Sequence, residues 1–304
     1  MSVKVFIDGS SGTTGLRIAD RLAARPDIEL LSISAEGRKD VNERAKVINS
    51  ADLAFLCLPD AASKEVMPLL RPDVKVLDTS TAFRTDAAWD YGFPELKGQK
   101  EKIKNSYRVA VPGCYASGFI SIARPLVELG LAPADYPFSC TGISGYSGGG
   151  KKMIAEYEDE NRDPRHESNR IYATSLTHKH LPEMRKLCGL TKKPVFSPIV
   201  GDFYAGMATS VLLPGVDAQR AWEALSDHYA GQKLVSVAPL GGDEPVIYAN
   251  TYAGKDTMRI QVSGQQDQCM VTAIFDNLGK GASGAAIQNM NLLLGLEETT
   301  GLSL

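Results

Sequence analysis

The sequence predicts an α/β protein with an N-terminal domain built on a parallel sheet, followed by an α+β domain with a largely antiparallel sheet. Three observations lead to this prediction. The chain has 304 residues, and at about 150 residues per domain such a length suggests two domains. Strand and helix patterns alternate strictly to about residue 80. Beyond about residue 112 many strand patterns alternate apolar with polar residues, as half-exposed antiparallel strands do.

In the first domain, short apolar runs predict buried strands, and the segments between them show helical spacing. The helix that follows the first strand places Leu16, Ile18 and Leu22 at such a spacing. Consecutive strands joined by helices form right-handed crossovers, so the pattern predicts a Rossmann-like parallel sheet. The predicted strands are 3–7, 28–33, 53–58 and 74–77, and the predicted helices are 16–23, 41–48 and 61–70.

The second domain has strand patterns at longer spacings, and the chain ends with a helical pattern over residues 282–296. Periodicity alone does not say where this last helix packs. The predicted strands are 138–143, 195–200, 207–213, 246–251, 258–263 and 269–275.

Composition excludes several classes of protein. A net charge of −3 gives no basic excess for binding nucleic acid. The first fifteen residues lack a signal-peptide pattern, and the longest apolar runs are too short to span a membrane. The 5 cysteines are scattered without a CxxC pair, which favours reduced thiols in a cytoplasmic protein.

A glycine-rich turn lies between the first strand and the first helix. Glycines in this position allow a tight turn and let backbone N–H groups approach a pyrophosphate at the start of the helix. The location within the first βαβ unit favours dinucleotide binding over a turn that is glycine-rich for steric reasons alone. The candidate cofactor-binding residues are Gly9, Ser10, Ser11, Gly12, Thr13, Thr14 and Gly15.

The segment after the second strand favours NADP(H) over NAD(H). An NAD site usually has an acidic residue there for the ribose 2′-hydroxyl. Here Ser34 is followed by Arg38 and Lys39, and hydroxyls with cations suit a 2′-phosphate. The alternative is a solvated pair of loop charges that includes Glu36.

Cys114 is the candidate nucleophile. The strand-like run 107–111 is broken at residues 112 and 113, and Cys114 then begins a helix. A thiol in the first turn of a helix meets unpaired N–H groups and the positive end of the dipole, which favour the thiolate. The alternative is a packing role, which we expect for Cys57, Cys140, Cys188 and Cys269.

A cysteine nucleophile needs an acid or base, and His178 and His180 are the candidates. If this segment is a strand, residues i and i+2 point the same way, and both imidazoles can face one pocket. A metal half-site is the alternative, but no second cluster of ligands supports it, so we expect no metal. We expect His166 and His228 to lie on the surface.

Residues 145–151 match the first part of a P-loop, but Lys152 stands where a Ser or Thr would hold Mg²⁺. Because a dinucleotide motif precedes this loop, we interpret it as lining the cofactor pocket near the nicotinamide. Ser144 and Gly145 are therefore candidate cofactor-binding residues.

Six motifs, in order along nearly the whole chain, resemble those of the N-acetyl-γ-glutamyl-phosphate reductase family in its shorter subclass. They are GSSGTTG at 9–15, DTSTAFR at 78–84, PGCY at 112–115, SGYSGGGK at 144–151, HKHLPE at 178–183 and DNLGKGASGAAIQNM at 276–290. The resemblance implies a fold like that of semialdehyde dehydrogenases. It also implies NADPH-dependent reduction of N-acetylglutamyl 5-phosphate to the 5-semialdehyde, in arginine biosynthesis.

The resemblance further implies a domain division. Residues 1–113 are expected to form the NADP-binding domain, joined by the C-terminal helix within 281–304. Residues 114–280 are expected to form the catalytic and oligomerisation domain of a homo-oligomer, either a dimer or a tetramer.

Site roles follow from the chemistry and the motif match together. Cys114 would form a thioester, and His178 or His180 would be the acid/base. Arg84 and Lys179 are candidates for binding the substrate, although spacing alone leaves a surface salt bridge open for Arg84. Asn277 is expected at the nicotinamide end of the cofactor.

The sequence departs from the family pattern beside the nucleophile. Val111 replaces an Asn, and Ala116 and Ser117 replace Pro-Thr. Loss of the Asn can weaken an oxyanion contact and reduce turnover. Three other functions remain open: an aspartate- or aminoadipate-semialdehyde dehydrogenase, a non-catalytic NADP-binding redox sensor, and a cysteine hydrolase.

Overall fold

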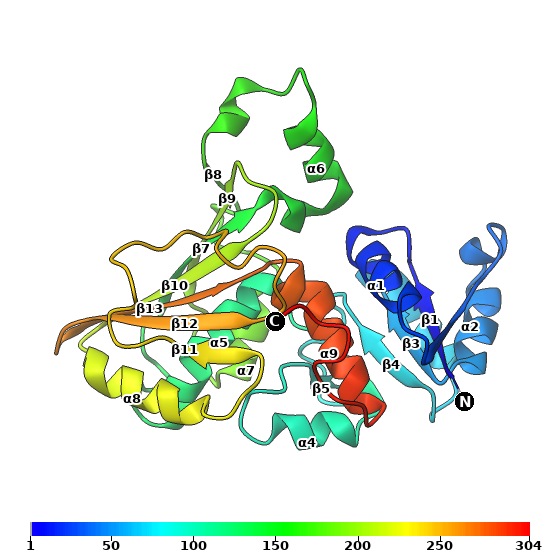
Figure 1. The fold of residues 1–304 in the computed structure, drawn as a ribbon, viewed down its shortest axis with the longest axis horizontal. Coiled ribbons are helices and arrows are strands. Elements are labelled where there is room, and N and C mark those ends of the chain that lie inside the picture. The colour runs from blue at the N-terminus through cyan, green and yellow to red at the C-terminus, as the bar shows by residue number, and fades with distance from the viewer. Residues whose placement is uncertain (1) are drawn as a thin grey trace. The chain divides into compact units, whose positions relative to one another are not determined.

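The computed structural model describes residues 2–304, which divide into two compact units (Figure 1). Unit 1 consists of residues 2–94, 98–112 and 282–302, and unit 2 consists of residues 95–97, 113–281 and 303–304. The chain therefore passes between the units several times. One crossing lies between Pro112 and Gly113, directly before the candidate nucleophile.

Unit 1 is built on a parallel sheet with strand order β2-β1-β3-β4-β6-β5. The order reverses beside β1, because β2 pairs with one of its edges and β3 with the other. Ligands of open parallel sheets bind at the carboxyl ends of strands at such a reversal. The strands are β1 Val3–Asp8, β2 Ile28–Leu31, β3 Leu53–Leu56, β4 Lys75–Asp78, β5 Asp90–Tyr91 and β6 Arg108–Ala110.

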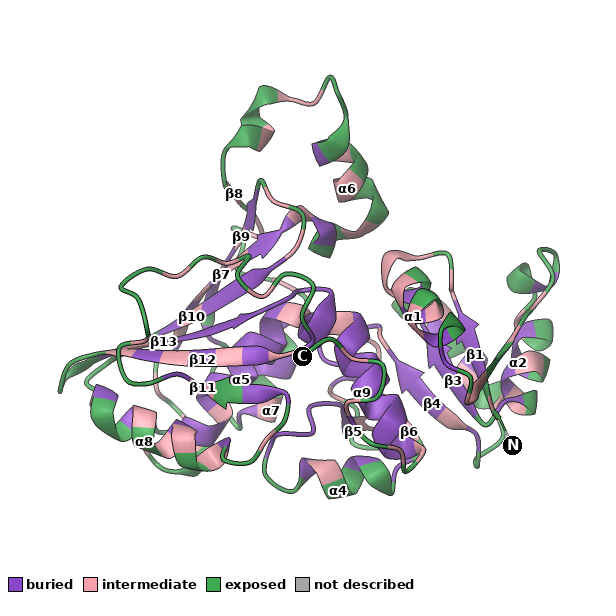
Figure 2. Cartoon of the chain, viewed as in Figure 1, coloured by how far each residue is buried: buried purple, intermediate pink, exposed green. Residues whose placement is uncertain are grey.

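Helices cover both faces of this sheet, because alternate strand residues point to opposite faces. Val5 and Phe55 pack in a cluster with residues of α1, α4 and α9, whereas Phe6 and Leu56 pack in a second cluster with α2 and α3. Helix α9 is buried along its whole length, as Figure 2 shows. The helices of unit 1 are α1 Thr13–Ala23, α2 Val41–Ser50, α3 Asp60–Val66, α4 Gln99–Lys104 and α9 Gly284–Leu293.

Unit 2 is built on a mixed, mainly antiparallel sheet with strand order β11-β12-β13-β10-β7-β9-β8. Only the pairs β7·β9 and β11·β12 are parallel within it. The predicted α/β architecture with a largely antiparallel second sheet is thus confirmed. The strands are β7 Ser139–Gly145, β8 Arg170–Ile171, β9 Val195–Gly201, β10 Met207–Pro214, β11 Val235–Val237, β12 Met258–Gly264 and β13 Gln268–Phe275.

Helices α5 and α8 pack on one face of the second sheet. Val211 and Val271 point to this face and are fully buried, whereas Leu212 on the opposite face is 49% exposed. The helices of unit 2 are α5 Cys114–Glu128, α6 Gly150–Glu158, α7 Leu181–Leu187 and α8 Ala218–His228, and Gly279–Ser283 forms a π-helical turn.

The predicted strand over residues 246–251 is wrong. This segment is an irregular, turn-rich loop in which Val246 and Tyr248 are exposed, and β11 pairs with β12 at that edge of the sheet instead. Pro245 precedes it, and Gly241 and Gly242 adopt positive φ. Alternating apolar residues therefore do not form a β-strand here, because this segment pairs with no neighbouring strand.

Candidate active site

Cys114 is the first residue of α5, where the helix has no side-chain cap. The N-cap residue is Gly113, which offers no side chain, and Pro112 before it ends the approach from β6. The first backbone N–H groups of α5 lack helical partners, and they surround the position of the thiol. The sequence pattern alone located this arrangement.

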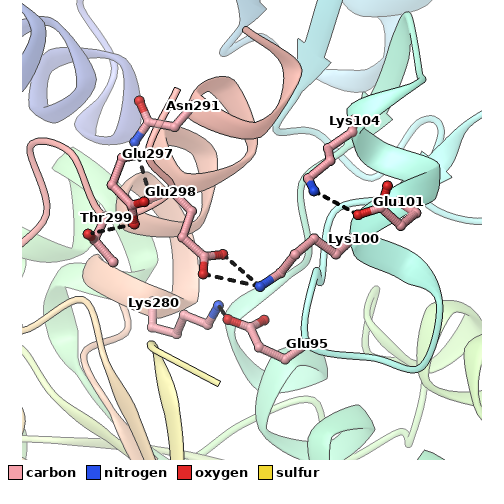
Figure 3. A network of polar contacts seen from close by, with 9 residues as sticks. All are labelled: Glu95, Lys100, Glu101, Lys104, Lys280, Asn291, Glu297, Glu298 and Thr299. Carbon is pink, nitrogen blue, oxygen red and sulfur yellow. Dashed lines mark hydrogen bonds and ion pairs between the residues drawn. The ribbon is translucent and has the colours of Figure 1, made fainter. Parts of the chain in front are cut away.

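A glycine from a distant part of the chain packs against the nucleophile. A Cβ placed on Gly281 would lie 3.0 Å from the Cβ of Cys114. The neighbouring Lys280 donates to Glu95 at 2.6 Å, and both side chains are almost completely buried (Figure 3). This ion pair anchors the π-helical turn whose glycine leaves room for Cys114.

His178 and His180 lie close together, but not in the predicted strand. They form a turn before α7, in which the backbone N–H of His180 donates to Nδ1 of His178 at 3.1 Å. Their rings are 4.7 Å apart and nearly perpendicular. Pro182 lies in the first turn of α7, where it favours helix initiation rather than an extended chain. Lys179, between the two histidines, is exposed.

Two tyrosines join the histidines to the start of α5. Tyr115, next to Cys114, has its ring 5.7 Å from that of His178, and its hydroxyl donates to the carbonyl of Ile199 at 3.1 Å. The hydroxyl of Tyr172 is 3.4 Å from Nε2 of His178. Sequence reasoning missed Tyr172, because it lies outside every motif and its approach depends on the turn before α7.

Burial determines the protonation of these groups. Desolvation, with a smaller contribution from Lys179, lowers the pKa of His178 to about 4. Desolvation also raises the pKa of Tyr172 to about 12, and the charge of a Cys114 thiolate adds to that effect. At neutral pH, His178 is therefore a neutral imidazole and Tyr172 retains its hydroxyl proton.

The other cysteines are poor thiolates. Burial raises the pKa of Cys57 to about 12 and that of Cys269 to about 11. Burial also raises the pKa values of Cys140 and Cys188. These surroundings agree with the packing roles expected for them.

The glycine-rich turn of unit 1 has the shape needed for a pyrophosphate. A Cβ on Gly9 would meet the Cys57 carbonyl oxygen at 2.3 Å, and one on Gly15 would meet the Gly9 carbonyl oxygen at 2.4 Å. At Gly12 the nearest atom would be the Gly9 carbonyl oxygen at 3.5 Å, an ordinary van der Waals contact, so this position at the start of α1 is less crowded than the other two. The buried Oγ1 of Thr13 has no hydrogen-bond partner among the described residues. The turn therefore fits a dinucleotide.

The cationic segment after β2 is exposed. Strand β2 ends at Leu31, and Ser34 accepts a hydrogen bond from the N–H of Gly37 at 3.0 Å. Arg38 and Lys39 lie in the short 3-10 helix Gly37–Lys39, with both side chains exposed. They are accessible to an anionic group.

Arg84 is buried, so the surface salt bridge left open by the sequence is wrong. Its side chain is 8% exposed and donates to the carbonyls of Val111 at 2.9 Å and Thr79 at 3.0 Å. The guanidinium therefore ties the end of β4 to the segment that leads to Cys114.

The loop after β7 is supported from behind by Asn277. This buried side chain accepts from the N–H of Gly206 at 2.8 Å and donates to Ser147 at 3.0 Å. Ser144 and Gly145 are also buried. A Cβ on Gly145 would meet the carbonyl oxygen of Tyr204 at 2.5 Å, so close backbone packing requires a glycine there.

The predicted site residues divide between the units. Gly9–Gly15, Ser34, Arg38 and Arg84 belong to unit 1, and Cys114, Lys179, both histidines of the turn and the loop after β7 belong to unit 2. The remaining histidines are half-buried rather than on the surface as expected: His166 stacks on Tyr157 at 4.7 Å, and His228 lies at the end of α8.

Residues 2–304 contain no group of three His, Cys, Asp or Glu side chains arranged to hold a metal ion. In the same residues no helix is long and apolar enough to cross a membrane.

Comparison with known proteins gives the family. The semialdehyde dehydrogenase NAD binding domain matches residues 4–106, and the semialdehyde dehydrogenase dimerisation domain matches residues 114–277. N-acetyl-gamma-glutamyl-phosphate reductase of Brucella ovis is 47% identical over 309 residues, which cover 97% of this chain and 100% of that protein. The chain belongs to the N-acetyl-gamma-glutamyl-phosphate reductase family. The reductase of Brucella anthropi is also 47% identical, over 310 residues.

Solved structures support the same fold for this reductase family member. Aspartate semialdehyde dehydrogenase II from Vibrio cholerae, in complex with ASA, has a TM-score of 0.67 at 16% identity and covers 97% of this chain and 99% of its own. A probable aspartate-semialdehyde dehydrogenase from Pseudomonas aeruginosa has a TM-score of 0.70 at 18% identity, with the same coverage. At these identities the similarity concerns the fold alone.

Proposed function

We propose that this chain reduces N-acetyl-γ-glutamyl phosphate to N-acetylglutamate 5-semialdehyde with NADPH and releases phosphate, as a cytoplasmic enzyme of arginine biosynthesis. The observation that carries the proposal is Cys114 at the uncapped start of α5, in the same unit as the His178–His180 turn and the phenol of Tyr172. The 47% identity to named reductases supplies the substrate.

Cys114 acts as the nucleophile. Its thiolate attacks the acyl carbon, the C–O bond to phosphate breaks, and phosphate leaves with its electron pair, which forms a thioester. When bound, the cofactor would supply a hydride to this carbon. The resulting thiohemiacetal oxyanion collapses as its C–S bond breaks, which releases the aldehyde, and the sulfur keeps the electron pair of that bond, which regenerates the thiolate. The N–H groups at the start of α5 stabilise the oxyanion while it exists.

The histidine turn handles the proton. His178 is neutral at pH 7, because burial lowers its pKa to about 4. Its Nδ1 accepts the N–H of His180, so the ring proton lies on Nε2, from which it can be donated to the oxyanion. The hydroxyl oxygen of Tyr172, 3.4 Å from Nε2 of His178, accepts the Nε2 proton in this tautomer, and the phenol proton can then be donated to the oxyanion. His180 remains the alternative acid/base, because its ring lies 4.7 Å from that of His178.

NADP(H) is the proposed cofactor. The uncapped N–H groups at the start of α1, where Gly12 is the N-cap, receive the pyrophosphate, and Ser34 and Arg38 bind the 2′-phosphate. Ser144 and Gly145 contact the nicotinamide end, and Asn277 acts by holding their loop through Ser147.

Arg84 and Lys179 are the proposed substrate-binding residues. Arg84 offers a guanidinium to the phosphate or carboxylate of the substrate while two of its N–H groups hold backbone carbonyls. Lys179 is exposed beside the histidines and offers a flexible ammonium.

We further propose that residues 1–113 with the helix of 281–304 act as the cofactor-binding domain, and 114–280 as the catalytic domain of a homo-oligomer. The uncovered face of the second sheet supports this proposal. Leu212, Ser139 and Val195 are neighbours across β10, β7 and β9, and two of them are apolar and about half exposed.

The test is a reverse assay: NADP reduction with N-acetylglutamate semialdehyde, with and without inorganic phosphate. We expect turnover only when phosphate is present. Aspartate semialdehyde and aminoadipate semialdehyde serve as competing substrates, and a higher kcat/KM for either would replace the proposed substrate. Release of phosphate from N-acetyl-γ-glutamyl phosphate in water without NADPH, with no oxidation of the semialdehyde, would indicate a hydrolase. No turnover of the acyl phosphate or of any semialdehyde would support a sensor.

A further inference from the structure

Glu183 has a contact that the reaction scheme above does not use. It lies in the first turn of α7, three residues after His180, and only 2% of its surface is exposed. Its Oε2 accepts a hydrogen bond from the backbone N–H of Gly113 at 3.2 Å. This bond joins two points of unit 2 that are separated by 70 residues.

The position of Gly113 makes this contact unusual. As the N-cap of α5, Gly113 has a backbone N–H without a helical partner and no side chain to cap the helix. A carboxylate from another helix therefore supplies the missing acceptor. The next residue is Cys114, so the carboxylate holds the peptide from which the nucleophile extends.

The same carboxylate belongs to the element that begins with the histidine turn. His180 is the N-cap of α7, and the N–H of Met184 donates to its carbonyl at 3.1 Å. The side chain of Glu183 thus links the backbone beside Cys114 to the short helix that follows the histidine turn.

We propose that Glu183 is a positioning residue that sets the distance between Cys114 and the His178–His180 turn by holding the N–H of Gly113. The proposal rests on the function given above, because it assumes that Cys114 and the histidines work together. A displacement of about 1 Å at a reacting group can reduce the rate by about 100-fold. Loss of the bond should therefore lower kcat and leave KM nearly unchanged.

From its position beside Gly113, we expect the carboxylate also to act electrostatically on the proposed nucleophile. A negative charge beside the first peptide of α5 opposes formation of a thiolate on the following residue. Glu183 thus improves geometry at the expense of thiol acidity. A purely structural residue far from Cys114 would not alter the pH at which the thiol reacts.

Two variants separate these effects. Glu183→Gln keeps a hydrogen-bond acceptor of the same reach and removes the charge. Glu183→Asp keeps the charge but is one methylene shorter, so its oxygen no longer reaches Gly113. Glu298→Gln is the matched control, because Glu298 is also a buried carboxylate, paired with Lys100 in unit 1.

Three measurements are made on the full-length protein: kcat and KM in the reverse assay, NADPH affinity as a check of folding, and the pH dependence of iodoacetamide labelling of Cys114. For Glu183→Asp we expect kcat to fall by about 10- to 100-fold, with KM and the labelling midpoint unchanged. For Glu183→Gln we expect nearly wild-type kcat and a labelling midpoint at lower pH. Glu298→Gln should change neither.

A Glu183→Asp protein with wild-type kcat would overturn the positioning role, as would an equal loss of kcat in the Glu298→Gln control. An unchanged labelling midpoint in Glu183→Gln would overturn the electrostatic effect. Labelling needs no substrate, so an inactive wild-type protein with the expected labelling shifts would contradict the proposed function alone.

Discussion

Cys114 lies beside backbone N–H groups that have no helical partner, and its side chain is closely packed. The N–H groups of α5 favour a thiolate at the first residue of the helix. Gly281 packs against its Cβ and limits where the sulfur can point. Both features agree with the role of nucleophile proposed for Cys114.

Replacement of Cys114 separates covalent catalysis from direct hydride transfer. We expect Cys114→Ala to abolish turnover while NADPH affinity remains unchanged, because the turn Gly9–Gly15 lies in unit 1. Cys114→Ser should also be nearly inactive, because an alcohol stays protonated near neutral pH. The check is intact mass spectrometry: wild-type protein incubated with the acyl phosphate, without NADPH, should gain one N-acetylglutamyl group. An adduct on another cysteine would contradict the mechanism.

His178 makes stability depend on pH. Its pKa is about 4 in the folded protein and near 6.5 when unfolded, so the unfolded chain binds more protons between these values. Stability should therefore fall as the pH decreases from about 6.5 to about 4. In the His178→Gln variant, the fall in stability that is due to protonation of His178 should be absent. Thermal unfolding of both proteins at several pH values between 7 and 4 tests the prediction, and parallel curves would show that another group is responsible.

At the scale of elements, the proposed preference for NADP(H) depends on the segment after β2. Arg38 and Lys39 are exposed at the start of the approach to α2. A charge-assisted bond to a 2′-phosphate contributes about 1.5–3 kcal/mol, or about 10- to 150-fold in affinity.

The double variant Arg38→Ala with Lys39→Ala tests this preference. We expect it to lose affinity for NADPH by about that factor and to bind NADH as the wild type does. Dissociation constants of both cofactors, measured by fluorescence, provide the comparison. Lys46→Ala is a suitable control, because Lys46 is an exposed cation of α2 that pairs with Glu43. If the double variant lost as much affinity for NADH as for NADPH, Arg38 and Lys39 would not be the residues that bind the 2′-phosphate.

Elements defined by local signals were predictable from the sequence, whereas those that depend on pairing were not. The turn at Gly9 and the helix start at Cys114 follow from glycine and proline chemistry within a few residues. The apolar alternation of 246–251 has the same local appearance as a strand, but no strand pairs with it. The contact between Glu183 and Gly113 spans 70 residues, so no local pattern contains it.

The histidine turn has one feature that the sequence predicted and one that it did not. The spacing of His178 and His180 led to the correct expectation that their rings lie together, but for the wrong reason, since the segment is a turn rather than a strand. Tyr172 could not be selected beforehand, because its hydroxyl reaches His178 only through the path of that turn.

At the scale of the whole molecule, the uncovered sheet face leads to a prediction about assembly. Leu212 lies in a row with Ser139 and Val195 across three strands, and it is 49% exposed. If this face joins two copies, Leu212→Glu would place two charges in an apolar interface and should produce monomers. Light scattering after size exclusion measures the mass. The control Leu240→Glu changes an exposed leucine outside the strands, and equal masses for wild type and Leu212→Glu would exclude this face as the interface.

The last helix has a consequence for synthesis on the ribosome. Val5 and Ile18 share one core with Ile287 and Met290, yet residues 113–281 of unit 2 are translated between them. At about 5–20 residues per second, that interval is roughly ten to thirty seconds. During this time the apolar face of the first strands is not covered by α9, and we expect chaperones to bind it. A nascent chain stopped at residue 281, which lacks α9, should therefore bind a hydrophobic dye and aggregate. The full-length chain should do neither.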